Sequence, residues 1–167
     1  MRHVLTPHPR SRCDAVTSLV VEVATGGAEL TLRYELSGDL ARIVVPDAAA
    51  TARVDGLWEH TCFEAFISQG GDAYSEFNVS PSTEWAAYRF DGYRQGMAPL
   101  ALPWPRIETR RGADTLDVQV TLARPPGSRL GLTAVIEEVG GRLSYWALAH
   151  PADQPDFHHA GGFTLAL

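Results

Sequence analysis

The chain has 167 residues, which is the usual length of one domain, and we expect residues 1–167 to form a single domain. With 45% hydrophobic and 20% charged residues, it has the composition of an ordinary globular protein. The net charge is −6, and all 14 basic residues are scattered arginines. This excludes the concentrated basic surface of a nucleic-acid binder, so no nucleic-acid partner is expected.

The N-terminal residues carry charges and prolines but no apolar run of the kind found in secretory signals. No stretch approaches the roughly 18 consecutive apolar residues of a membrane span, so no membrane partner is expected. The two cysteines, Cys13 and Cys62, form no CxxC pair. We therefore expect a reduced, cytoplasmic protein.

The first part of the chain reads as an extended arm followed by strands. Pro7 and Pro9 oppose helix formation in residues 1–16. Strands are predicted at residues 19–24, 29–36 and 41–45, separated by glycine-containing turns. In the second strand, alternate residues are apolar and are expected to face the core: Leu30, Leu32, Tyr34 and Leu36.

Three strands are predicted in the centre of the chain, at residues 58–69, 73–80 and 84–91. In the first of them, Phe63, Ala65 and Ile67 form an apolar face. The opposite face mixes aromatic and polar residues, and in this strand it comprises Trp58, His60, Cys62, Glu64 and Phe66. Such a mixed face is either a hydrated outer surface or the floor of a polar ligand site.

The last part of the chain alternates loops and strands. A long loop over 92–106 contains Met97 and Trp104, and a second loop over 150–162 contains three histidines. Strands are predicted at residues 115–122, 130–138, 143–149 and 163–167. About ten short strands with no periodic helix predict an all-β protein, an antiparallel two-sheet β-sandwich.

Several segments together carry a family resemblance: LTPHP at 5–9, DGLWEHTCFEAFI at 55–67, YSEFNVSPSTEWAAYRFDGYR at 74–94 and YWALAHPADQPDFHHAGGF at 145–163. The chain resembles the bacterial DOMON-like domains, relatives of the family 9 carbohydrate-binding modules, over nearly its whole length. The resemblance implies a two-sheet sandwich, and the wider superfamily binds sugars or haem.

The resemblance also implies a sugar site. The sugar-binding relatives hold a terminal sugar between tryptophans and bind its hydroxyls with charged and amide side chains. A tryptophan followed six residues later by a glutamate belongs to this pattern, and Trp58 and Glu64 match it. Asn78 and Arg89 are further candidates for hydroxyl binding, and Trp146 or Trp104 for the second tryptophan.

Other chemistries were weighed for the remaining polar residues. His150, Asp153, Asp156, His158 and His159 are close in sequence, but their spacing fits no zinc motif. His150 and His158 are instead expected at the rim of a ligand pocket.

Two further chemistries need residues that the sequence does not clearly supply. Haem requires axial ligands, for which Met97 with His150 or His158 is an alternative. The sequence contains no nucleophile elbow, phosphate-binding glycine loop or HExxH motif, so catalysis is not expected.

We therefore predict a non-catalytic domain that binds a saccharide or another sugar-containing small molecule, with no cofactor and no metal. The predicted ligand-binding residues are Trp58, Glu64, Asn78, Arg89, Trp146, His150 and His158. Two alternatives stay open: a protein-interaction module without a small-molecule ligand, including a homodimer formed through an exposed strand edge, and a haem-binding DOMON domain.

Overall fold

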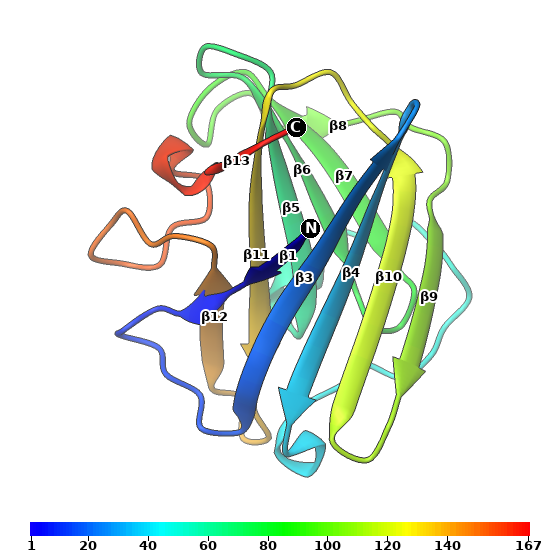
Figure 1. Ribbon diagram of the computed structural model, residues 1–167, viewed down its shortest axis with the longest axis vertical. Helices are drawn as coiled ribbons and strands as arrows, with labels where there is room; N and C mark the ends of the chain where they lie inside the picture. Colours follow the sequence, from blue (N-terminus) through cyan, green and yellow to red (C-terminus); the bar gives the residue numbers. More distant parts are fainter.

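The computed structural model describes residues 1–167 and consists of two antiparallel β-sheets that pack face to face (Figure 1). The predicted all-β sandwich is therefore confirmed. The helical elements are three short 3-10 turns, and none is long and apolar enough to cross a membrane.

The five-stranded sheet lies in front in Figure 1. Across the sheet its strands are β1 (Arg2–Val4), β3 (Val16–Gly26), β4 (Glu29–Gly38), β10 (Thr115–Ala123) and β9 (Arg106–Arg111). The glycine turn between β3 and β4 and the inward direction of Leu30, Leu32, Tyr34 and Leu36 are as predicted, because these four side chains are fully buried.

The eight-stranded sheet lies behind it. Its strands are β2 (Thr6–Pro7), β12 (Leu143–Ala147), β11 (Arg129–Glu137), β5 (Cys62–Ser68), β6 (Tyr74–Val79), β7 (Trp85–Phe90) and β8 (Ala98–Pro99), with β13 (Leu165–Ala166) paired to β11. The 3-10 turns are η1 (Leu40–Arg42), η2 (Leu57–Glu59) and η3 (Ala160–Gly162).

The N-terminal arm joins the two sheets. Strand β1 pairs with β3 in the five-stranded sheet, whereas β2 pairs with β12 in the eight-stranded sheet. Leu5 lies between these two short strands and is buried in the core. The arm is therefore extended, as predicted, and it also adds a strand to each sheet.

The core fills the space between the sheets with alternate side chains from both. From the eight-stranded sheet it takes Phe63, Ala65 and Ile67, the predicted apolar face. Tyr34 crosses from the five-stranded sheet and donates a hydrogen bond to the backbone oxygen of Glu64 at 2.7 Å. This bond satisfies the phenol hydroxyl in the dry interior and ties the sheets together.

Two predicted strands differ in the structure. The segment 41–45 is mostly η1, because Asp39 accepts a hydrogen bond from the Ala41 backbone at 3.2 Å and starts a turn. The strand predicted at 58–69 begins only at Cys62, because Gly56 takes a left-handed conformation (φ 81°) and leads into η2. Trp58 therefore lies on a turn and not on a strand.

The edge strands of both sheets are poor templates for further pairing. Strand β9 was not predicted, because its sequence RIETRR lacks an apolar run. It forms one edge of the five-stranded sheet and carries arginines, while β1 at the other edge has only three residues. The eight-stranded sheet ends at β2 and β8, which have two residues each and contain Pro7 and Pro99. Charges, prolines and short edge strands all oppose edge-to-edge association.

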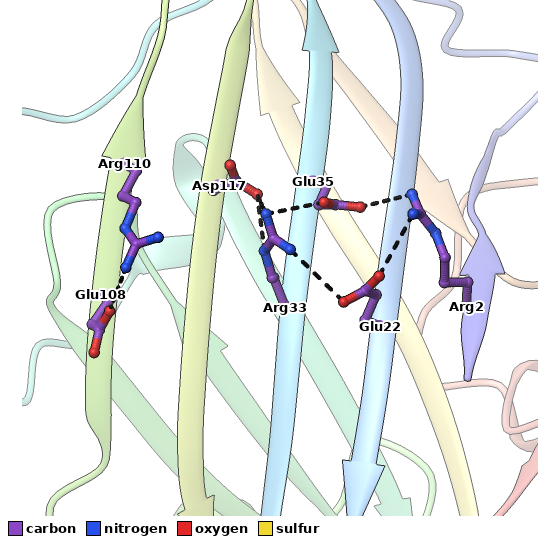
Figure 2. Close-up of polar contacts among 7 residues, drawn as sticks. All are labelled: Arg2, Glu22, Arg33, Glu35, Glu108, Arg110 and Asp117. Atoms are coloured by element: carbon purple, nitrogen blue, oxygen red, sulfur yellow. Dashed lines mark hydrogen bonds and ion pairs between the residues drawn. The ribbon is translucent and has the colours of Figure 1, made fainter.

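The outer face of the five-stranded sheet is a hydrated surface of alternating charges (Figure 2). Arg33 on β4 contacts Glu22 on β3 (3.8 Å), Glu35 on β4 (3.1 Å) and Asp117 on β10 (2.9 Å). Arg2 on β1 continues the network to Glu22 and Glu35, at 3.6 and 2.8 Å. Cross-strand pairs of opposite charge stabilise a sheet modestly.

We predict that Arg33→Ala lowers the free energy of unfolding by about 1 kcal/mol at low salt, because it leaves three carboxylates without their shared cation. The loss should shrink at high salt. The matched control is Arg110→Ala on edge strand β9, whose cation pairs only with the exposed Glu108 on the same strand. Urea unfolding at two salt concentrations measures both variants, and equal effects would contradict a role for the network.

Candidate functional site

The outer face of the eight-stranded sheet is buried as well as its inner face. Strands β5 and β6 are buried at nearly every position, including Glu64 and Glu76, which are only 3% and 5% exposed. Both glutamates point away from the core, as the alternation of side chains along a strand requires. Something other than the five-stranded sheet must therefore cover this face.

Three connecting segments provide the cover. The first contains η2, where the Trp58 ring meets the Tyr88 ring edge to face with centroids 5.9 Å apart. Tyr88 donates a hydrogen bond to Asp55 at 2.5 Å, which fixes this segment to β7. The mixed face predicted from the sequence is thus an enclosed surface at this point.

The second and third segments hold each other. Tyr93 and Arg94, which follow β7, both donate hydrogen bonds to Asp156, at 2.8 and 3.0 Å. The third segment follows β12, and its Phe163 stacks on Phe66 of the sheet with centroids 5.8 Å apart. These contacts join residues that are about 60 to 100 positions apart in the chain.

Between the three segments and the sheet lies a cavity of about 400 Å³. Its floor comes from the strands and its walls from the covering segments. The lining residues are Trp58, Glu64, Glu76, Phe90, Arg94, Met97, Val135, Tyr145, Pro155, Phe157 and His158. This volume and this mixture of aromatic and polar side chains are typical of a small-molecule site.

Two buried carboxylates lie at the polar end of the cavity. Glu64 accepts a hydrogen bond from Thr133 at 3.2 Å through Oε2, but its Oε1 has no partner in the protein. Glu76 accepts a hydrogen bond from Asn78 at 2.8 Å, and its other oxygen lies 3.9 Å from Nε2 of His158. A buried acceptor without a donor is costly, so Glu64 is suited to accept a hydrogen bond from a ligand.

Burial shapes the ionisation of this site. It raises the pKa of Glu64 well above its usual range, and the neighbouring Glu76 carboxylate raises it further. Burial also raises the pKa of Glu76 to about 7, against the opposing effects of Asn78 and Arg94. In His158, burial and the Arg94 charge lower the pKa to about 4, against the opposing effect of Asp156. His158 is therefore neutral at neutral pH.

The hydrogen bonds also indicate the tautomer of His158. The backbone N–H of Arg94 donates to the Tyr74 hydroxyl at 3.2 Å, so the hydroxyl hydrogen is free to point elsewhere. The Tyr74 hydroxyl lies 2.7 Å from Nδ1 of His158 and donates to it. The neutral imidazole then carries its hydrogen on Nε2, which faces Glu76.

Arg94 is held in an uncommon backbone conformation. Its φ of 53° lies in the left-handed region, which costs a non-glycine residue on the order of 1 kcal/mol or more. The hydrogen bonds to Tyr74 and Asp156 hold it there. Strain of this kind tends to collect at functional positions, and here it directs the Arg94 side chain into the wall of the cavity.

The structure brings three of the predicted site residues together. Trp58, Glu64 and His158 all line the cavity. Asn78 lies on the same face of the sheet but is fully buried, and it reaches the cavity only through its hydrogen bond to Glu76.

The other three lie elsewhere. Arg89 has the opposite strand parity from Tyr88, is exposed at the end of β7 and pairs with Asp91. Trp146 belongs to the core between the sheets, where its indole nitrogen donates to Ser144. His150 lies 2.8 Å through its Nε2 from the backbone oxygen of Thr6 and is not part of the cavity lining.

Most of the remaining lining residues were not among the predicted ligand-binding residues. Glu76 and Phe90 could have been found, because strand alternation places them on the face that carries Glu64. Arg94, Pro155 and Phe157 lie in irregular segments, and no sequence pattern indicates which way such residues point. Met97, considered above only as a haem ligand, is a further wall residue of this kind.

The site does not have the donor set of a metal centre. No three His, Cys, Asp or Glu side chains converge in a way that could hold a metal ion. Met97 and His158 do line the same cavity, but Nδ1 of His158 is bonded to Tyr74 and Nε2 faces Glu76. Two buried carboxylates in the floor suit a polar ligand better than the apolar face of a haem.

Comparison with known proteins identifies the fold. The sequence matches no protein-family model, and no curated protein matches it. The structure is similar to that of a candidate carbohydrate-binding protein from Bacteroides uniformis, with a TM-score of 0.66 and 14% identity over 98% of this chain and 84% of the other. It is also similar to a family 9 carbohydrate-binding module from Caldicellulosiruptor kristjanssonii in complex with cellotriose.

The second similarity has a TM-score of 0.51 and 10% identity, and it covers 89% of this chain and 72% of the other. The chain has the β-sandwich fold of the family 9 carbohydrate-binding modules. Identities this low establish the shared fold, and function has to be argued from the site.

We predict that Glu76 and His158 make opposite contributions to the pH dependence of stability. Between about pH 4.5 and about pH 7, folded Glu76 keeps a proton that the unfolded chain has lost, so the free energy of unfolding falls as the pH rises. Between about pH 4 and about pH 6.5, the unfolded chain holds a proton that folded His158 lacks, so the free energy of unfolding rises with pH.

Removing one group should expose the other. Compared with the wild type, Glu76→Gln should make the slope of unfolding free energy against pH more positive, and His158→Gln should make it more negative. Each change should be at most about 1.4 kcal/mol per pH unit. Urea unfolding from about pH 4.5 to about pH 6.5 measures these slopes, and two variants that shift in the same direction would contradict the assignment.

Proposed function

We propose that this chain is a non-catalytic, DOMON-like domain that binds a saccharide or another sugar-containing small molecule in the cavity on its eight-stranded sheet. The observation that carries the proposal is the pairing of an aromatic wall with a buried carboxylate that has an unpartnered oxygen, Trp58 with Glu64. A sugar presents an apolar C–H face and hydroxyl donors, and this pair offers a partner for each.

The cavity favours a ligand that donates hydrogen bonds. Glu64 and Glu76 are acceptors when ionised, and the unpartnered Oε1 of Glu64 is the group that most needs a donor. Phe90, Val135 and Phe157 add apolar surface around the carboxylates. The family 9 fold supports this proposal, since one structural neighbour with that fold holds cellotriose.

The blunted strand edges weigh against the alternative of an interaction module. Strand addition requires an exposed edge, and the edges at β2, β8, β1 and β9 are either very short or charged. We therefore place the ligand on the covered face of the eight-stranded sheet. The cytoplasmic location and the absence of nucleic-acid and membrane partners stay predictions from the sequence.

We predict that a matching sugar raises the melting temperature and that Trp58→Ala abolishes the effect. A ligand that binds only the folded state at a hundred times its Kd adds about 2.7 kcal/mol, or about 5–10 °C for a chain of this size. A thermal-shift series over mono- and disaccharides, including amino sugars, measures it. Trp58 is 37% exposed and lies outside the main core, so its truncation should leave the fold intact.

The control is Trp104→Ala. Trp104 is 65% exposed, packs edge to face against Trp85 and is absent from the cavity lining. This variant should keep the full ligand response. A ligand response that survives in Trp58→Ala, or one that is lost in Trp104→Ala, would place the binding site elsewhere.

A further inference from the structure

The polar end of the cavity carries more negative than positive charge. Glu64 and Glu76 are two carboxylates on neighbouring strands, where diagonal positions lie about 7–8 Å apart, and Arg94 is the only arginine in the lining. The Arg94 guanidinium, however, pairs with Asp156 at 3.0 Å, so its charge is already matched. The two glutamates thus share no cation of their own.

No other group near the glutamates supplies the missing charge. The titratable and charged groups around them are Cys62 on β5, Tyr74 on β6, Tyr88 on β7, Tyr145 on β12, Arg94 after β7, and Asp156 and His158 in the last covering segment. His158 is neutral, and its Nε2 is 3.9 Å from Glu76. Cysteine and tyrosine add no positive charge at any pH.

An unpaired carboxylate in a buried site is costly when ionised, and a cation within a few ångströms offsets that cost. Glu64 meets this description most fully, because it is 3% exposed and one of its oxygens has no partner. The overall charge of −6 also draws small cations toward the molecule.

Resting on the proposed saccharide function, we infer that the ligand is an amino sugar whose protonated amine lies between the carboxylates of Glu64 and Glu76. The aromatic wall at Trp58 then packs against the sugar ring. An ammonium group fits the site because it offers three hydrogen-bond donors together with a positive charge.

The pKa directions agree with an ammonium partner. Burial without a cation raises the pKa of Glu64 well above its usual range and the pKa of Glu76 to about 7. A bound ammonium favours the ionised carboxylates, so binding releases protons. Affinity for an amino sugar should therefore increase as the pH rises toward about 7, as long as the amine stays protonated.

Isothermal titration calorimetry with three matched sets of sugars tests the inference. Each set contains a 2-amino hexose (glucosamine, galactosamine or mannosamine), its neutral parent and its N-acetyl form. We expect one amino hexose to bind on the order of ten- to a hundredfold more tightly than both neutral members of its set at about pH 6.5. Its affinity should also increase between about pH 5.5 and about pH 7.

Isosteric variants locate the amine. Glu64→Gln and Glu76→Gln keep an oxygen acceptor for hydroxyl groups but remove the negative charge, so each should lower the preference for the amino sugar on the order of tenfold. Glu108→Gln on β9 makes the same change in net charge on the opposite sheet and should leave the preference unchanged. Circular-dichroism melts of each variant check that it is folded.

The outcomes separate this inference from the proposed function. Neutral and N-acetyl sugars that bind as tightly as the amino forms overturn the amine and leave the saccharide site in place. A preference that persists in the Glu64→Gln/Glu76→Gln double variant overturns it too. If no sugar binds, with or without an amine, the proposed function fails and the inference fails with it.

Discussion

The eight-stranded sheet must keep both of its faces from water, and the rest of the structure follows from that constraint. Side chains alternate along a strand, so a strand that is buried at nearly every position needs a cover on each side. The five-stranded sheet covers one face of β5 and β6. Three irregular segments cover the other, and because irregular backbone packs less evenly than a sheet, it leaves the cavity that contains Glu64 and Glu76.

The polar groups of this cavity are held by one another more than by water. Asn78 supports Glu76 from beneath, Thr133 supports Glu64, and Tyr74 links Arg94 to His158. Such a network fixes the positions of its members, since moving one leaves another without its hydrogen bond. The carboxylates are thereby preorganised, and a ligand does not have to order them when it binds.

Strand alternation made much of this arrangement predictable. It predicted the sandwich, the inward faces and the shared face of Trp58 and Glu64, although Trp58 reaches that face from a turn and not from a strand. It could not predict the cover, because the direction of Arg94 depends on a left-handed backbone and on Asp156, which is 62 positions away. Trp146 shows the opposite failure: its apolar ring was read as a ligand platform, but it lies in the core between the sheets.

The N-terminal arm has a consequence for how the chain folds. Thr6 of β2 pairs with Ala147 of β12, and these residues are separated by 141 positions. Contacts between such distant segments form slowly, because the entropy of closing a long loop is lost before the contact stabilises anything. A growing chain on the ribosome therefore exposes its first strands long before their partner strand exists, and the arm can join the two sheets only after nearly all of the chain has been synthesised.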